Sequence, residues 1–270
     1  MCIDCGCGDA ANTHKHSHDH SDDHAHDHGH RHIGPDGKEY YHRHDNDQSA
    51  HEHGRTIKVE QDVLSKNNGI AIVNRQWLDD HHITAFNLMS SPGAGKTTLL
   101  EKTLERLPQD GTVAVLVGDQ ETDHDARRLQ GKAALVKQIN TYRSCHLDAA
   151  MISKELETYE EAQINLLLIE NIGNLVCPAA FDLGEHCRVA VLSVTEGEDK
   201  PVKYPVLFNN ADVVLITKTD LIPHLDWDME QCHSYIRKSG SRARIIELSA
   251  RTGEGMGAWI DYLQTMKRYD

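Results

Sequence analysis

From residue 85 onward, short apolar runs alternate with longer stretches whose hydrophobic positions have helical spacing. The short runs predict strands at 85–89, 113–117, 164–169, 189–194, 213–216 and 244–248. The longer stretches predict helices at 97–107, 147–161, 202–209, 228–238 and 257–267. Strands and helices that alternate in this way favour an α/β fold, with a mostly parallel sheet and helices on both faces.

The chain before residue 85 has a different pattern. Apolar positions within 56–82 predict a helical lead-in, and the sequence Asn67-Asn68-Gly69 favours a break in it. Residues 14–53 consist largely of His, Asp, Ser and Gly, which cannot build a core, so disorder is expected there. The expected organisation is therefore a disordered tail at 1–54, a helical lead-in at 55–84 and an α/β domain at 85–270.

Charge narrows the range of partners. The chain has 28 basic and 42 acidic residues, a formal charge of −14, which disfavours general nucleic-acid binding because phosphates would be repelled. No apolar run approaches the roughly 18 residues of a membrane span, and no secretory signal begins the chain. Clustered thiols fit the reducing cytoplasm, which is the expected location.

Histidine is concentrated in the tail, where 13 of the 20 imidazoles fall between His14 and His53. Imidazole suits nickel, copper and zinc, and many loosely placed ligands favour storage or buffering over one defined site. An inert solubilising tail or a tag is the alternative, which the interleaved spacing disfavours. The candidate storage ligands are His14, His16, His18, His20, His24, His26, His28, His30 and His32.

Three of the seven cysteines, Cys2, Cys5 and Cys7, lie within the first seven residues. Three thiolates at this spacing can surround one soft cation, and incidental thiols at an exposed terminus are the alternative. A fourth ligand is open, with the α-amino group and a downstream imidazole as candidates.

The strongest motif is the sequence Ser-Ser-Pro-Gly-Ala-Gly-Lys-Thr at 90–97, between a predicted strand and a predicted helix. This context is typical of a phosphate-binding P-loop, in which backbone N–H groups, the lysine and the helix N-terminus hold a nucleotide's phosphates. Ser90 replaces the usual first glycine. The candidate nucleotide-binding residues are Ser91, Pro92, Gly93, Ala94, Gly95, Lys96, Thr97 and Thr98.

Two further motifs indicate guanine. Lys218 and Asp220 match the Asn-Lys-x-Asp motif of GTPases, although Thr217 replaces the asparagine. The aspartate accepts both N–H groups on the Watson–Crick edge of guanine, and adenine offers no such donor pair. Ser249 and Ala250 match the loop that supports guanine O6.

Carboxylates at two strand ends favour Mg²⁺. Glu170 stands where common GTPases have the aspartate of Asp-x-x-Gly, and Asp119 begins an acidic segment after the second strand. With the Thr97 hydroxyl, they form the expected magnesium ligands. A helix N-cap or a solvated surface is the alternative for each carboxylate. Lys96 is the expected catalytic cation, because it would neutralise charge that develops on the phosphates.

Taken together, these motifs resemble HypB-type proteins, the nickel-insertion GTPases of [NiFe]-hydrogenase maturation. The resemblance also rests on Cys-His-Leu-Asp-Ala at 145–149, Glu-Asn-Ile-Gly-Asn-Leu-Val-Cys-Pro at 170–178 and the Cys-x-x-Cys-x-Cys start. It implies a homodimeric P-loop GTPase of the SIMIBI class that uses GTP and Mg²⁺. It also implies a HypA-type metallochaperone as partner and a hydrogenase large subunit as client. Turnover should be slow, because no arginine finger is obvious from the sequence.

The same resemblance assigns residues. Cys2, Cys5 and Cys7 would hold nickel tightly, and Cys145, His146 and Cys177 would hold nickel or zinc in a second site. Asp125 would lie near the γ-phosphate and position the attacking water. Taken alone, Cys145 and Cys177 would be read as structural, as are Cys187 and Cys232. A urease-type nickel GTPase and a metal-storage protein with a regulatory GTPase domain remain the alternative functions.

Overall fold

The computed structural model describes residues 29–33, 39–43, 47–107, 112–119, 124–133, 135–141, 144–159 and 162–266, with side chains from residue 61 onward. Its main feature is a seven-stranded sheet in the order β5-β4-β6-β3-β7-β8-β9, in which all neighbouring strands are parallel. The strands are β3 (Thr84–Ser90), β4 (Val113–Asp119), β5 (Leu135–Asn140), β6 (Leu166–Glu170), β7 (Cys187–Ser193), β8 (Val213–Thr217) and β9 (Arg244–Glu247). The predicted α/β class is confirmed.

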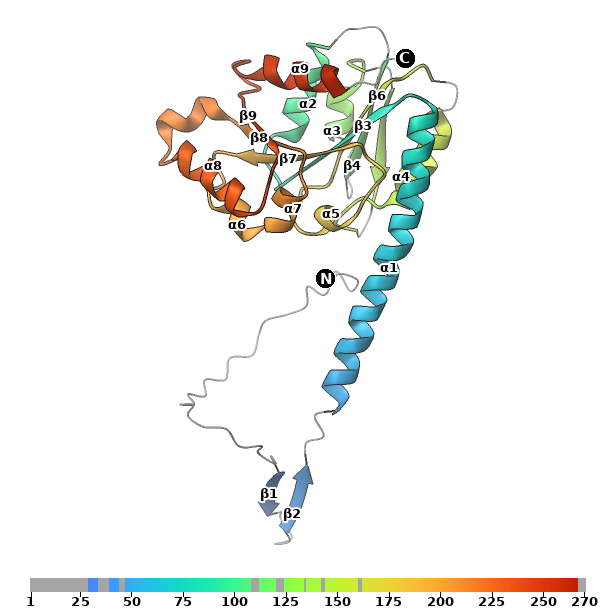
Figure 1. Ribbon diagram of the computed structural model, residues 1–270, viewed down its shortest axis with the longest axis vertical. Helices are drawn as coiled ribbons and strands as arrows, with labels where there is room; N and C mark the ends of the chain where they lie inside the picture. The colour runs from blue at the N-terminus through green and yellow to red at the C-terminus, as the bar shows by residue number, and fades with distance from the viewer. Residues whose placement is uncertain are drawn as a thin grey trace.

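Helices cover both faces of the sheet (Figure 1). One face carries α2 (Lys96–Leu104), α3 (His124–Leu129) and α9 (Met256–Met266). The other carries α1 (Asp47–Asp80), α4 (Ala149–Leu156), α5 (Cys177–Ala180), α6 (Lys200–Lys203), α7 (Pro205–Asn209) and α8 (Met229–Lys238). Side chains alternate between the two faces along β3. Phe86 and Leu88 join the apolar core under α2, α3 and α9, whereas Ala85 and Met89 join two apolar clusters on the opposite face.

The strand order sets the position of a ligand site. β3 lies at the centre of the sheet, and the chain fills β4, β5 and β6 on one side of it before β7, β8 and β9 on the other. In open parallel sheets, ligands bind beyond the carboxyl ends of the strands where the order reverses. The loop after β3 is therefore at the expected place.

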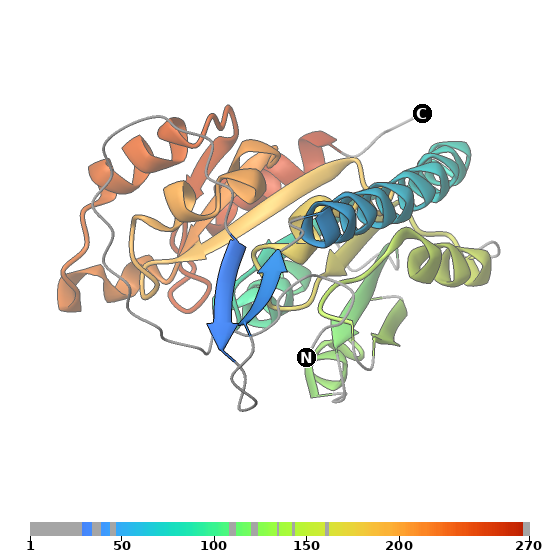
Figure 2. The same cartoon turned by 90° about the horizontal axis from the view of Figure 1, so that it is seen from below.

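The lead-in helix α1 is one continuous helix, so the predicted break at Asn67-Asn68-Gly69 is wrong. Asn67 is buried, and its side chain accepts from the backbone N of Ala149 at 2.9 Å and donates to the carbonyl of Asp182 at 2.8 Å. These tertiary bonds occupy a side chain that would otherwise compete with the helical backbone. Figure 2 shows α1 running beside α4.

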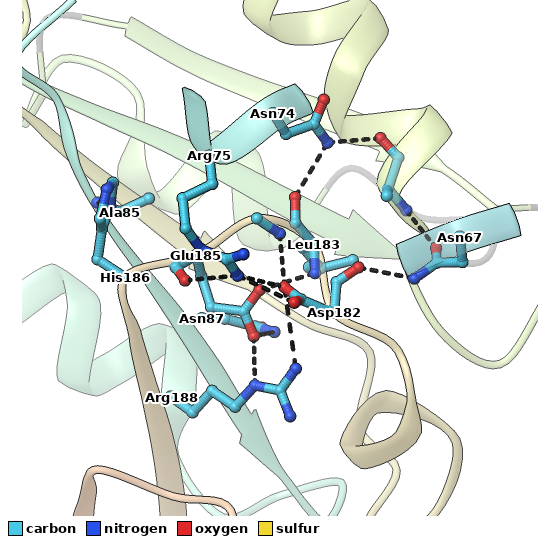
Figure 3. A network of polar contacts seen from close by, with 12 residues as sticks. Asn67, Asn74, Arg75, Ala85, Asn87, Asp182, Leu183, Glu185, His186 and Arg188 are labelled. Carbon is cyan, nitrogen blue, oxygen red and sulfur yellow. Dashed lines mark hydrogen bonds and ion pairs between the residues drawn. The ribbon is translucent and has the colours of Figure 1, made fainter. Parts of the chain in front are cut away.

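Polar side chains dock α1 on the domain (Figure 3). Asn74 is 1% exposed and donates to the carbonyls of Ala149 and Leu183 at 2.8 and 3.0 Å. Arg75 pairs with Asp182 at 2.7 Å. The helix is therefore fixed by specific hydrogen bonds as well as by apolar packing.

The N-terminal segment has more regular backbone than expected. β1 (Gly29–Ile33) and β2 (Glu39–Arg43) form an antiparallel pair, and α1 begins at Asp47. The sequence Gly-Pro-Asp-Gly at 34–37 between the strands is rich in turn-forming residues, which is a local reason for the pairing.

Other differences have local causes. The predicted helix at 202–209 is split into α6 and α7 at Tyr204, because Pro205 has no N–H to continue the helical ladder. Helix α4 is shorter than predicted and passes into a 3₁₀ turn, Glu157–Tyr159. The apolar pattern predicts neither α3 nor β5; β5 is an edge strand whose polar residues interrupt that pattern.

Candidate nucleotide and metal site

The loop between β3 and α2 has the backbone of a phosphate-binding loop. Gly93 and Gly95 adopt positive φ of 76° and 98°, which is the left-handed region that favours glycine. Helix α2 begins directly afterwards, at Lys96, so its free N–H groups face the loop. The predicted nucleotide-binding residues at 91–98 thus form the loop after a buried strand and the first turn of α2.

Ser90 stands at the position of the usual first glycine of the loop, and its side chain has partners there. It is the last residue of β3 and is fully buried. Its hydroxyl donates to the carbonyl of Ser91 at 2.6 Å and accepts from Lys96 Nζ at 2.7 Å. The serine therefore holds the lysine over the loop. Burial lowers the pKa of Lys96, while Glu170, Glu196 and Asp125 act in the opposite direction.

The chain places Glu170 beside the start of α2. The Thr97 hydroxyl donates to Glu170 Oε1 at 2.7 Å, and both residues are buried. Burial raises the pKa of Glu170 to about 7, although the Thr97 hydrogen bond and Lys96 lower it. Its second oxygen, Oε2, is buried and has no hydrogen-bond partner among the described residues. A buried hydroxyl and a carboxylate with an unused oxygen are hard oxygen ligands, so these residues fit Mg²⁺.

The other expected acidic residues lie near the same edge. Asp119 ends β4, two positions beyond Val117, which pairs with Glu170 in the sheet. Asp125 lies in the first turn of α3, within 3.9 Å of Arg128. Arg128 also donates to Thr98 on α2 at 3.2 Å, so α3 is tied to the helix of the phosphate loop. The intervening residues 120–123 lie outside the described part of the chain.

The base-recognition motif joins the phosphate loop on its other side. Lys218 has a positive φ of 60°, and its Nζ donates to the carbonyl of Gly93 at 2.7 Å. Thr217 donates to the carbonyl of Ala94 at 2.9 Å, so the threonine contacts the loop from the position that is asparagine in common GTPases.

Asp220 is oriented by the second guanine loop. The Ser249 hydroxyl donates to Asp220 Oδ1 at 2.6 Å. Ser249 is fully buried, and Ala250 packs against the core. The structure thus brings all three sequence motifs to one edge of the sheet.

A second group of ligands lies beyond Glu170. The ligand atoms of Cys145, His146 and Cys177 all lie within 4.8 Å of one another. Cys177 is 9% exposed, and the other two are half-buried. Burial lowers the pKa of His146, which favours the neutral ring that binds metals. The ring packs on Phe181 at a centroid distance of 3.9 Å.

The segment from Glu170 to Cys177 joins the two sites. Gly173 lies against the phosphate loop, where an added Cβ would be 2.9 Å from Pro92 Cα. Asn174 Nδ2 donates to the carbonyl of Cys145 at 3.4 Å, so the two metal-ligand arms are bonded to each other. Neither Asn174 nor Asn171 could be singled out from the sequence, because their hydrogen-bond partners on the 145–147 loop lie 24 to 29 residues away along the chain.

The remaining ligand predictions are not covered by described side chains. Cys2, Cys5, Cys7 and the histidines from His14 to His28 lie outside the described residues. His30 and His32 lie in β1, whose backbone alone is described. In the described part of the chain, no helix combines the length and apolar character of a membrane span.

The fold and the loop after β3 define a P-loop nucleotide-binding protein. The nucleotide-binding domain of the CobW/HypB/UreG family matches residues 84–247. A hydrogenase maturation factor HypB from Azotobacter chroococcum is 51% identical over 213 residues, which cover 79% of this chain and 70% of that relative. This chain belongs to the HypB family of hydrogenase maturation factors.

Solved structures agree with this assignment. The HypB structure from Archaeoglobus fulgidus has a TM-score of 0.70 at 38% identity, covering 76% of this chain and all of that one. The Helicobacter pylori HypB structure, in complex with nickel, has a TM-score of 0.71 at 34% identity, covering 75% and 95%. The P-loop fold with a parallel sheet is common to all three.

Proposed function

We propose that this protein is a GTP-hydrolysing nickel metallochaperone that supports nickel insertion into the large subunit of a [NiFe]-hydrogenase. One observation carries the proposal: Cys177 of the Cys145–His146–Cys177 group lies seven positions after Glu170, on a segment that packs against the phosphate loop at Gly173. A metal ligand on the same short segment as the expected γ-phosphate contact favours a protein that ties metal transfer to nucleotide state. The names of its relatives support the hydrogenase client.

The hydrolysis chemistry follows from the phosphate loop. Mg²⁺, held by Thr97 and Glu170 with Asp119 nearby, would neutralise charge on the β- and γ-phosphates. Lys96 would leave Ser90 and contact the phosphate oxygens on which charge develops. Asp125 would orient the attacking water. Slow turnover is expected, as in a timing switch.

Guanine selectivity follows from Asp220. Its carboxylate would accept from N1 and N2 of guanine, and the Lys218 stem would cover the face of the base. Ser249 already fixes the carboxylate through a 2.6 Å hydrogen bond. An adenine base has no donor pair for this carboxylate, so ATP should bind poorly.

Nickel is the proposed cargo. Two thiolates and one imidazole suit nickel and zinc, and three ligands leave a four-coordinate ion one position short. An open position favours a transfer site over a permanent one. The N-terminal Cys2, Cys5 and Cys7 would form a tighter nickel site, and the histidine tract would store nickel.

The proposed assembly is a homodimer that receives or passes nickel through a HypA-type metallochaperone. The similarity of this chain to HypB hydrogenase maturation factors supports these partners.

Hydrolysis of GTP and ATP, each measured with and without Ni²⁺, tests the proposal. We expect GTP hydrolysis that depends on Mg²⁺ and changes with Ni²⁺, and little ATP hydrolysis. Lys96→Ala, which removes the phosphate contact, is the inactive control. A chain that binds nickel but hydrolyses neither nucleotide would instead be a metal-storage protein.

A further inference from the structure

Asn171 lies between the nucleotide site and the proposed metal ligands. It follows Glu170 at the end of β6 and is 1% exposed. Its Oδ1 accepts from the backbone N of Leu147 at 3.3 Å and from the backbone N of Ile172 at 2.9 Å. Its Nδ2 donates to Asn87 Oδ1 at 3.2 Å. One side chain therefore contacts the loop after His146, its own segment and the central strand.

The direction of these hydrogen bonds is fixed at both ends. Backbone N–H groups only donate, so Asn171 must present its oxygen to Leu147. At the other end, Asn87 Nδ2 donates to the buried carboxylate of Glu185 at 3.3 Å (Figure 3). Asn87 must therefore present its oxygen to Asn171. Glu185 Oε1 also accepts from Arg188 at 2.8 Å. Asn171 therefore has one orientation that satisfies all of its partners.

Leu147 is a rigid point through which Asn171 can act on the metal ligands. It directly follows Cys145 and His146 in the chain and is fully buried. Its side chain packs against β4, where a Cβ on Gly118 would come within 2.9 Å of it. The backbone N–H of Leu147 donates to Asn171, which lies at the start of the segment that ends at Cys177. Loss of that acceptor would leave a buried N–H without its partner and would release the Cys145–His146 loop.

We propose that Asn171 is a positioning residue for the metal site, which sets the separation between the Cys145–His146 pair and Cys177 without itself binding metal. The inference rests on the proposed role of these three residues as metal ligands. Residues that orient metal ligands from behind typically change metal affinity by about 10- to 100-fold when they are replaced.

The test is a Co²⁺ titration of the full chain in which Cys2, Cys5 and Cys7 are replaced by serine. The readout is the thiolate-to-cobalt charge-transfer absorption, because the histidine tract has no thiolate and does not contribute to it. Asn171→Ala is compared with Asn74→Ala, which removes another buried asparagine with two backbone partners, at α1.

We expect Asn171→Ala to weaken Co²⁺ binding by about 10- to 100-fold, with Asn74→Ala within twofold of the parent. Asn171→Asp keeps the acceptor for Leu147 and loses only the donor to Asn87, so its affinity should lie closer to that of the parent than to that of Asn171→Ala. If the alanine variant does not fold, Asn171→Ser takes its place, because the shorter side chain withdraws the acceptor from Leu147.

Three results would overturn the inference. The first is an affinity within twofold of the parent for Asn171→Ala or, where that variant does not fold, for Asn171→Ser. The second is an equal loss in Asn74→Ala, because the effect would then be general destabilisation. The third is a parent chain with no charge-transfer band. That result would remove the proposed metal site itself, whereas the first two results concern Asn171 alone.

Discussion

Glu170 and Lys96 are two buried side chains of opposite charge at the carboxyl end of the sheet. Burial shifts the pKa of each toward its neutral form, upward for Glu170 and downward for Lys96. Glu170 also has an oxygen without a partner among the described residues. In the nucleotide-free site, burial of the charged forms of these two groups therefore lowers the free energy of unfolding. Bound Mg²⁺ and phosphates would offset this loss.

This loss predicts a pH dependence of stability in the Mg²⁺-free and nucleotide-free chain. Folding raises the pKa of Glu170 from 4.5 to about 7, so between these values the folded state holds a proton that the unfolded state has lost. The free energy of unfolding should therefore fall as pH rises from 4.5 to 7, by on the order of 3 kcal/mol from this group. Urea unfolding of Glu170→Gln should lack this part of the slope; an unchanged slope would contradict the assignment.

Asp220 predicts the choice of base. Asp220→Asn should weaken GTP binding by about 2 kcal/mol or more and should favour xanthosine triphosphate, because its amide can donate where xanthine carries O2. Binding of both nucleotides is measured by competition with a fluorescent analogue. Asp226→Asn, an exposed residue in the following loop, is the matched control. Undiminished GTP binding in Asp220→Asn would remove the residue from the base site.

The four described cysteines should differ in reactivity. Cys187 and Cys232 are fully buried, and burial raises the pKa of each thiol to about 12, so alkylation of the native chain at pH 8 should leave them intact. Cys145 and Cys177 should react faster and should be protected by Ni²⁺. Mass spectrometry of the peptides gives each rate. Labelling of Cys187 as fast as Cys145, or no protection by Ni²⁺, would refute the expectation.

Among the helices and strands, those fixed by neighbouring residues could be predicted from the sequence, whereas those fixed by contacts with distant residues could not. β3, the phosphate loop and the start of α2 follow from a short apolar run, two glycines and a helical pattern. The break at Asn67 was predicted wrongly because its partners, Ala149 and Asp182, lie 82 and 115 residues away. Likewise, the sequence offers no signal that Asn171 contacts Leu147. Cys145 and Cys177 were paired through family resemblance and not through their spacing.

The docking of α1 gives a prediction for this element. Asn74→Ala leaves the buried carbonyls of Ala149 and Leu183 without their donor, so unfolding should become easier by about 1–3 kcal/mol. Gln76→Ala is the control, because Gln76 is exposed and bonds only within the helix, to Asp80. Urea midpoints measure both. Equal midpoints for the two variants would show that the asparagine does not fix the helix.

At the scale of the whole molecule, one parallel sheet brings three distant motifs and a group of soft ligands to its carboxyl edge. A single segment, 170–177, contacts the phosphate loop at one end and carries the proposed metal ligand Cys177 at the other. The Cys145–His146 loop lies outside this segment but is hydrogen-bonded to it. With the proposed ligands in place, a change at the γ-phosphate would therefore reach both Cys177 and the Cys145–His146 pair.

If nucleotide and metal binding are linked, the affinity for Ni²⁺ must depend on the bound nucleotide. The test uses the full chain in which Cys2, Cys5 and Cys7 are replaced by serine, loaded either with GDP or with a non-hydrolysable GTP analogue. Ni²⁺ is titrated into each, and binding is followed by the thiolate-to-nickel charge-transfer absorption. We expect the affinity for Ni²⁺ to differ by about 5- to 150-fold between the GDP state and the GTP-analogue state. Ni²⁺ must then change the ratio of the GDP and GTP-analogue affinities by the same factor. Equal affinities in both states, or a difference that survives in Cys177→Ala, would contradict this linkage.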